Sequence, residues 1–355
     1  MAVILKTLTI QQVVLPLRCI VFSCLIFISI NWANADTPPS NMRLNPTEYL
    51  SIADFPSPYD NEPDIPAQHQ LEALVWKPAG DGPFPVVIMM HGVGGLYYKT
   101  NPDCVDNDRQ CWGIAEKFKY WGKLLSNDNP YGIRDKFLVI AVDSYTTRGY
   151  DHFGVVNIPA AQRDLNVTSY LGRPWDLYAA INYLKTREDV NPQQIFTLGF
   201  SDGGGTVLSS IASSDNAVMV NESNYFQGID NNSTIGRSMM QNIGIKAAAT
   251  LYPSCGFFGY FNGVYATYAP LLVQIGADDM TTLASLCENR QSDAYTNGIE
   301  PQNFVLDIYQ GMTHGFDYLQ YETAQACLAT EKILKFFSTQ LGDAIFKNSF
   351  DGKCM

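Results

Sequence analysis

The sequence predicts an α/β fold, in which a mostly parallel, doubly wound sheet carries helices on both faces. Short apolar runs alternate with helical segments along the chain, which is the element order of right-handed βαβ units. Most of these runs are apolar throughout, as strands buried on both faces of a parallel sheet are. One of them leads into Gly199-Phe200-Ser201-Asp202-Gly203, a glycine-rich turn between a predicted strand and a predicted helix.

Seven segments are predicted as strands. Leu71–Pro78 alternates apolar and polar side chains, which is typical of a half-buried strand. The other six are short apolar runs: Pro85–Met90, Phe137–Val142, Ile195–Phe200, Ala247–Tyr252, Leu271–Ile275 and Phe304–Ile308. In an open α/β sheet, ligands bind outside the carboxyl ends of the strands. The residues that follow these runs are therefore the candidates for a site.

Four segments between and after the strands are predicted as helices: Cys111–Leu125, Trp175–Leu184, Gly204–Ile211 and Thr323–Leu341. In the first of them Ile114, Phe118, Trp121 and Leu125 share one face, which indicates a helix packed on the sheet. The segment Ser213–Gly244 is long and rich in Asn, Ser and Gly. Because long loops in compact domains are usually functional or disordered, we interpret residues 213–244 as a cap insertion near the site.

The first 35 residues are predicted to be a secretory signal peptide. Their only charges are Lys6 and Arg18, the stretch Cys19–Ile30 is apolar, and Ala33-Asn34-Ala35 is a small-x-small cleavage site. The apolar stretch is shorter than a membrane span, which favours cleavage after Ala35 over an uncleaved anchor. We therefore expect a secreted or periplasmic protein.

Residues 36–355 are predicted to form a single domain, because no repeat or low-complexity tract marks a boundary. The whole chain of 355 residues carries a formal net charge of −12. Without the two cations of residues 1–35 the charge becomes −14. Such an acidic surface argues against nucleic acid and anionic membranes as partners.

Cysteine usage indicates disulfide bonds. Of the eight cysteines, two lie in the predicted signal peptide, and six remain: Cys104, Cys111, Cys255, Cys287, Cys327 and Cys354. An even number in an exported chain allows up to three bridges, and fifteen connectivities are formally open. We favour pairing them in chain order: Cys104–Cys111, Cys255–Cys287 and Cys327–Cys354. No histidine lies near them, so their spacing does not indicate a zinc site.

The pentapeptide at residues 199–203 has the G-x-S-x-G form of a nucleophile elbow. In that turn the residues two before and two after the serine must lack a bulky Cβ, and Gly199 and Gly203 meet this demand. The turn would project the Ser201 hydroxyl above the sheet. The alternative is an ordinary glycine-rich turn, so the motif needs support from partner residues.

A serine nucleophile needs a base, which is usually histidine. In proteins with this elbow the order along the chain is serine, acid, histidine. Of the four histidines only His314 follows Ser201, and it lies just after the last predicted strand. Between the two, Asp278 and Asp279 follow the predicted strand Leu271–Ile275, and either could orient the imidazole.

The tetrahedral intermediate of acyl transfer needs donors for its oxyanion. The backbone N–H of Asp202 is one candidate, at the start of a predicted helix whose dipole favours an anion. The second would come from the loop His91–Gly95 after an early strand, where Val93 is our choice and Gly92 the next. An ordinary strand-to-helix turn is the alternative for this loop. Nothing here implies a metal or an organic cofactor.

With these residues assembled, Leu71 to Leu341 resembles the dienelactone hydrolase family of α/β hydrolases. The shared motifs are His91-Gly92-x-x-Gly95, Asp143-Ser144-x-x-x-Arg148-Gly149, the elbow, Tyr252-Pro253-x-Cys255, Gly276-x-x-Asp279 and His314-Gly315-Phe316. The resemblance implies the α/β-hydrolase fold and selects Asp279 over Asp278 as the acid. It also supports the pairing of Cys255 with Cys287.

The chain departs from that family at its nucleophile, since dienelactone hydrolases proper use cysteine where this sequence has Ser201. The departure favours a serine-nucleophile esterase branch. The resemblance leaves two roles for Arg148: orienting an anionic group of the substrate, or a structural ion pair with Asp143 or Asp176.

The sequence as a whole predicts an exported serine hydrolase that cleaves a small-molecule carboxylic ester or lactone through an acyl-enzyme intermediate. A triad alone does not fix the substrate, because specificity depends on the pocket and the cap. The alternatives are a peptidase or polyester depolymerase on the same fold, and a non-catalytic exported binding protein.

Overall fold

The computed structural model describes residues 38–53, 70–100, 112–148, 167–170, 172–212, 242–256 and 265–342. All of them belong to one unit of the chain, Asp36–Met355. The predicted signal peptide thus lies outside them, as does all of the predicted cap except its last three residues. No helix in the described ranges is both long enough and apolar enough to cross a membrane.

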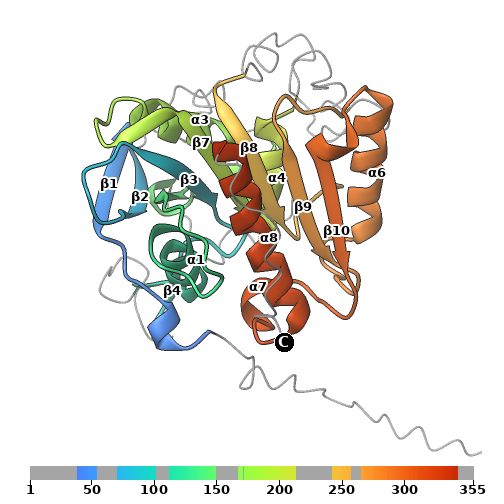
Figure 1. Ribbon diagram of the computed structural model, residues 1–355, viewed down its shortest axis with the longest axis horizontal. Helices are drawn as coiled ribbons and strands as arrows, with labels where there is room; N and C mark the ends of the chain where they lie inside the picture. The colour runs from blue at the N-terminus through green and yellow to red at the C-terminus, as the bar shows by residue number, and fades with distance from the viewer. Residues whose placement is uncertain are drawn as a thin grey trace, which may run out of the picture. The chain divides into compact units, whose positions relative to one another are not determined.

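One eight-stranded sheet occupies the centre of this unit (Figure 1), with the order β1-β2-β6-β3-β7-β8-β9-β10. The strands are β1 (Glu48–Ala53), β2 (Gln70–Trp76), β3 (Phe84–Met90), β6 (Leu138–Asp143), β7 (Val190–Phe200), β8 (Ile245–Leu251), β9 (Leu271–Gly276) and β10 (Phe304–Tyr309). β2 runs antiparallel to both of its neighbours, and the other adjacent pairs are parallel. The predicted mostly parallel sheet is confirmed.

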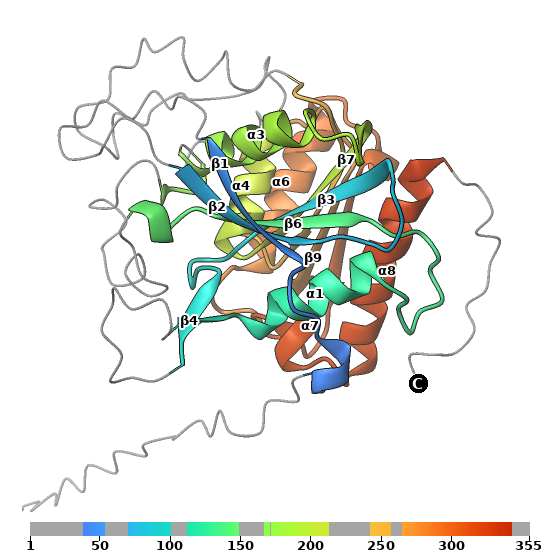
Figure 2. The same cartoon turned by 90° about the vertical axis from the view of Figure 1, so that its left-hand side faces the viewer.

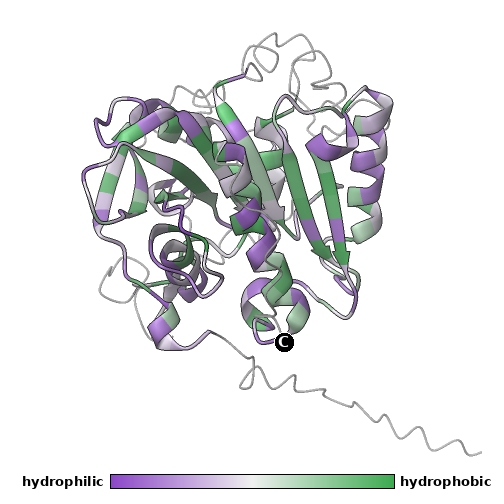
Figure 3. Cartoon of the chain, viewed as in Figure 1, coloured by the Kyte–Doolittle hydropathy of each residue, from purple (hydrophilic) through white to green (hydrophobic). Residues whose placement is uncertain are grey.

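Burial explains which strands the sequence revealed. β6 and β9 are buried along their whole length, and Figure 3 shows apolar residues concentrated in the central strands. All seven predicted strands are present, but β1 was not predicted, because this edge strand buries only Ile52 fully. β7 begins at Val190, earlier than predicted, because residues 191–194 (Asn-Pro-Gln-Gln) interrupt the apolar pattern.

Helices cover both faces of the sheet, as Figure 2 shows. On one face lie α1 (Glu116–Ser126) and α8 (Ala324–Leu341), with the short α7 (Phe316–Leu319) before α8. On the other face lie α3 (Arg173–Leu184), α4 (Asp202–Ser210) and α6 (Ala284–Thr296). The four predicted helices correspond to α1, α3, α4 and α8. The doubly wound arrangement is therefore confirmed.

The prediction of one helix over residues 111–125 was wrong at its start. Trp112–Ile114 forms β5, which pairs antiparallel with β4 (Tyr97–Lys99), and α1 begins only at Glu116. A Cβ on Gly113 would lie 2.8 Å from Cζ of Tyr98, so the exposed Tyr98 ring would have to shift to admit a side chain there. α6 was not predicted, because the residues it buries are Cys287, Arg290 and Ala294, which form no apolar stripe.

Candidate active site

Ser201 occupies a sharp turn between β7 and α4. Its φ of 54° lies in the left-handed region, where strain is retained when the surrounding structure enforces it. A Cβ on Gly199 would lie 2.4 Å from the Gly203 carbonyl oxygen, and one on Gly203 would lie 2.2 Å from the Met90 carbonyl oxygen. Both glycines are thus sterically required, and the turn has the geometry that G-x-S-x-G predicts.

Replacing Gly203 by alanine should lower the free energy of unfolding by about 3 kcal/mol or more, because the added methyl group meets rigid backbone. Gly94→Ala is the matched control, since a Cβ at Gly94 has no atom within 4 Å among the described residues. Chemical denaturation of both variants checks the prediction. Equal stabilities would contradict the steric role of Gly203.

His314 bridges Ser201 and Asp279. Its Nε2 lies 2.9 Å from Ser201 Oγ, and its Nδ1 lies 2.8 Å from Asp279 Oδ2. The three residues follow β7, β9 and β10, whose parallel alignment brings them to one edge of the sheet. Such a chain of contacts lets the imidazole take the serine proton while the carboxylate fixes its tautomer. The structure brings these three predicted residues together.

The chain has the α/β-hydrolase fold. Its elbow after a parallel strand and the chain order Ser201, Asp279, His314 are those of that fold, and they sit on the expected sheet. No family model matches the chain, and no curated protein is similar to it in sequence. The identification therefore depends on topology and on the geometry of the site.

Several solved structures are similar to this α/β-hydrolase fold at low sequence identity. A Klebsiella pneumoniae protein assigned as a dienelactone hydrolase is 16% identical, with a TM-score of 0.47 over 82% of this chain and 99% of its own. A thermophilic esterase from Thermogutta terrifontis, solved with propionate, is 15% identical, with a TM-score of 0.47 over 84% of this chain and 97% of its own. Dipeptidyl peptidase 4 from Porphyromonas gingivalis is 16% identical, with a TM-score of 0.49 over 84% of this chain and 36% of its own.

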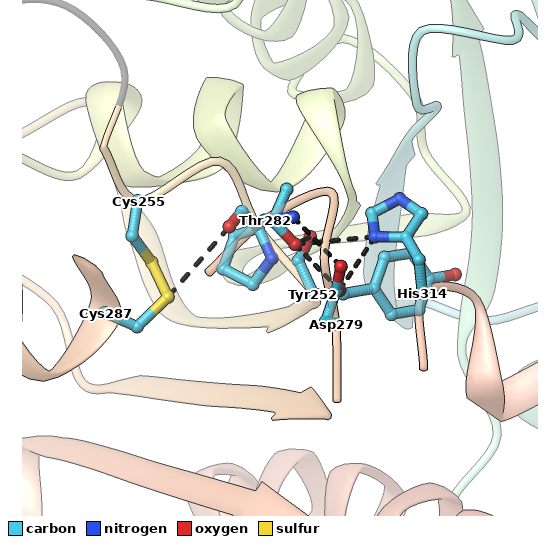
Figure 4. The surroundings of a disulfide bond; sticks show 7 residues. Tyr252, Cys255, Asp279, Thr282, Cys287 and His314 are labelled. Carbon is cyan, nitrogen blue, oxygen red and sulfur yellow. Dashed lines mark hydrogen bonds and ion pairs between the residues drawn. A yellow bond between two sulfur atoms is a disulfide. The ribbon is translucent and has the colours of Figure 1, made fainter. Parts of the chain in front are cut away.

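Asp279, rather than Asp278, faces the histidine. Asp279 is 2% exposed, while Asp278 is exposed to solvent. The Asp279 carboxylate also accepts hydrogen bonds from the amide and the hydroxyl of Thr282 (Figure 4) and from the amide of Thr281. Burial opposes its ionisation, but the hydrogen bonds from His314 and Thr282 outweigh burial and lower its pKa. The carboxylate is held ionised beside the imidazole.

The two predicted oxyanion donors flank the serine. Asp202 is the first residue of α4, so its amide points toward the helix N-terminus. The loop after β3 approaches from the other side, since a Cβ on Gly92 would lie 3.2 Å from the Cβ of Ser201. Val93 follows and packs against Tyr145 and Val167. Within the described ranges, neither the Val93 nor the Asp202 amide donates a hydrogen bond to the protein.

His91, the first residue of this loop, is a structural histidine. Its Nδ1 donates to the Gly92 carbonyl at 2.7 Å, and its Nε2 accepts from the Ser144 amide at 3.1 Å. These two bonds require the neutral imidazole, and complete burial, assisted by the charge of Arg173, lowers its pKa well below the ordinary value. His91 therefore connects the end of β3 to the end of β6.

Arg148 forms a buried ion pair with Asp176. Its two terminal nitrogens lie 2.9 and 2.8 Å from the two carboxylate oxygens, and the side chains are 2% and 0% exposed. Asp143, the other suggested partner, instead accepts hydrogen bonds from the amides of Tyr145 and Thr146. The structure thus shows the ion pair with Asp176 that was one of the two roles left open, and it buries the Arg148 side chain.

One predicted disulfide lies beside the site. Cys255 and Cys287 are joined at an S–S distance of 2.04 Å, which ties the loop after β8 to α6 (Figure 4). Cys327 is also disulfide-bonded, and its predicted partner Cys354 lies outside the described residues. Cys104 and Cys111 lie outside them as well. The pairing of Cys255 with Cys287 is confirmed.

A second polar cluster, which the sequence analysis missed, consists of Tyr252, Asp317 and Trp121 and contacts the His314 ring through Tyr252. The Tyr252 ring packs edge-on against the imidazole, with centroids 4.6 Å apart, and Tyr252 has a φ of 41°. Its hydroxyl donates to Asp317 at 2.8 Å, and Asp317 also accepts from the Trp121 indole at 2.7 Å. Burial raises the pKa of both Asp317 and Tyr252. Asp317 lies three residues after His314, a spacing that carries no recognisable motif.

Proposed function

We propose that this protein is an exported serine hydrolase that cleaves carboxylic esters or lactones of small molecules. The observation that carries the proposal is the continuous hydrogen-bonded chain from Ser201 Oγ through His314 to Asp279. Export is proposed from the predicted signal peptide at residues 1–35. The ester or lactone class is proposed from the motifs shared with dienelactone hydrolases and from serine at position 201.

The geometry supports a two-step reaction. Ser201 Oγ attacks the carbonyl carbon while His314 Nε2 takes its proton, and the C=O pair moves to oxygen as an oxyanion. The amides of Val93 and Asp202 are the proposed donors to that oxyanion. When the tetrahedral intermediate collapses, His314 protonates the leaving alkoxide and an acyl-enzyme remains. Water then attacks the acyl carbon with His314 as base, and Ser201 regains its proton as the acid leaves.

The exposure of Ser201, His314 and Asp279 is consistent with their proposed roles as nucleophile, base and acid. Ser201 is 9% exposed, so most of its surroundings are protein. The His314 side chain is 28% exposed, whereas the Asp279 carboxylate is fully covered. A charged imidazole formed during the reaction therefore stands between solvent and a buried counterion, where the ion pair is only weakly screened.

Covalent labelling with a fluorophosphonate tests the proposal directly. We expect the native protein to be modified at Ser201, as peptide mapping by mass spectrometry would show, and the heat-unfolded protein to remain unlabelled. A panel of short p-nitrophenyl esters, lactones, peptides and polyester films would then identify the bond that is cleaved. Failure of the native protein to label would favour a non-catalytic binding protein, and cleavage of peptides or polyester alone would favour those alternatives.

A further inference from the structure

One buried arginine connects the two sides of the proposed oxyanion site. Arg173, the first residue of α3, is 0% exposed. Its Nη1 donates to Asp202 Oδ2 at 2.6 Å, its Nη2 donates to the His91 carbonyl at 2.6 Å, and its Nε lies 3.2 Å from Ser144 Oγ. The planar fork of the guanidinium thus binds the end of β3 and the start of α4 at once.

Both acceptors belong to the segments that carry the proposed oxyanion donors. The His91 carbonyl is in the peptide that leads into Gly92 and Val93, and Asp202 carries the other donor on its own backbone. We infer that Arg173 is a positioning residue that fixes the separation of these two amides, an inference that rests on the proposed function. A preorganised oxyanion site depends on such fixed distances, because donors must meet the oxyanion without rearranging.

The charge of Arg173 has a second consequence for the same site. Asp202 is 8% exposed, and its carboxylate belongs to the residue whose backbone amide is a proposed oxyanion donor. Without a partner, this buried carboxylate would oppose the oxyanion that its own backbone amide is placed to stabilise. The Arg173 cation at 2.6 Å neutralises it. Arg173 therefore offsets the negative charge of the Asp202 carboxylate, in addition to fixing the positions of the two proposed donor amides.

The test compares arginines at the two ends of α3. Arg173→Met removes the fork beside the site, whereas Arg187→Met removes an arginine just past the other end, where it binds Glu48 and Asp189. We expect Arg173→Met to lower kcat for a short p-nitrophenyl ester by on the order of 10²-fold, with KM within about threefold. Arg187→Met should leave kcat per active site unchanged.

Two further variants separate positioning from folding. Arg173→Lys keeps a buried cation but lacks the planar guanidinium that binds Asp202 and the His91 carbonyl together. Its kcat should therefore stay below wild type by roughly tenfold. Arg173→Met/Asp202→Asn removes the unpaired carboxylate, so it should recover part of the activity lost in Arg173→Met. Rates are expressed per site titrated with fluorophosphonate, so that unfolded molecules are not counted, and Arg173→Lys serves if Arg173→Met does not fold.

The outcomes distinguish this inference from the proposed function. If wild type hydrolyses the ester but Arg173→Met and Arg173→Lys keep wild-type kcat, the positioning role is wrong and the proposed function stands. The positioning role would also be overturned if Arg173→Met raised KM with kcat unchanged, or if Arg187→Met lowered kcat by the same factor. If wild type neither labels nor hydrolyses any substrate of the panel, the proposed function fails, and the inference fails with it.

Discussion

Ser201→Ala is expected to lower kcat for a short p-nitrophenyl ester by on the order of 10⁶-fold, with the fold intact. The hydroxyl 2.9 Å from His314 Nε2 is the proposed attacking group, and alanine offers no nucleophile in its place. Because alanine keeps the Cβ, it can occupy the same turn at φ 54° with the contacts of Gly199 and Gly203 unchanged. Steady-state kinetics and circular dichroism of the purified mature protein check this result.

A second serine on the same helix provides the control. Ser210 is buried at the end of α4, and its hydroxyl donates to the Thr206 carbonyl within that helix. Ser210→Ala should therefore retain wild-type kcat and should still label with fluorophosphonate. Residual turnover of Ser201→Ala above about one thousandth of wild type, after contaminating esterases are excluded, would contradict the assignment of the nucleophile.

The sequence predicted those strands and turns whose local residue pattern is determined by burial or by steric contact. Each central strand is recognisable because both of its faces lie in the core, and the elbow is recognisable because steric contact leaves only glycine at positions 199 and 203. β1 and α6 lacked such patterns, since the first is a half-exposed edge and the second buries a disulfide-bonded cysteine and an arginine. Their existence depends on tertiary contacts that no local window contains.

The residues of the proposed site also fall into two groups: those that the sequence predicts and those that depend on tertiary contacts. Chain order reduced the base to His314, but the residues alone left Asp278 and Asp279 open, and resemblance to a family was needed to choose. Arg173 and Asp317 could not be found in this way, because their partners are distant in the chain and their contacts form only when strands and helices assemble. For Arg148 the sequence left two roles open and two possible ion-pair partners, and the structure shows the pair with Asp176.

The paired aspartates give the sharpest remaining test of the site. Asp279→Asn should lower kcat by on the order of 10⁴-fold, because an amide in place of Oδ2 no longer holds the imidazole in the tautomer that accepts the serine proton. Asp278→Asn is the matched control, with the same change one residue earlier on an exposed side chain, and it should keep kcat near wild type. The opposite order of effects in steady-state kinetics would mean that Asp278 is the acid.

The same two variants should also differ in how stability depends on pH. The Asp279 carboxyl has a lowered pKa in the folded protein, so ionisation of this group stabilises the fold above the ordinary carboxyl pKa of about 4. That contribution is lost as the pH falls through the lower, folded-state pKa. The gap in unfolding free energy between wild type and Asp279→Asn should therefore be widest near neutral pH and should narrow below about pH 4. Urea titrations at several pH values measure the gap, and a gap that stayed constant down to pH 3 would show that the Asp279 carboxylate is not held in its charged form by His314 and Thr282.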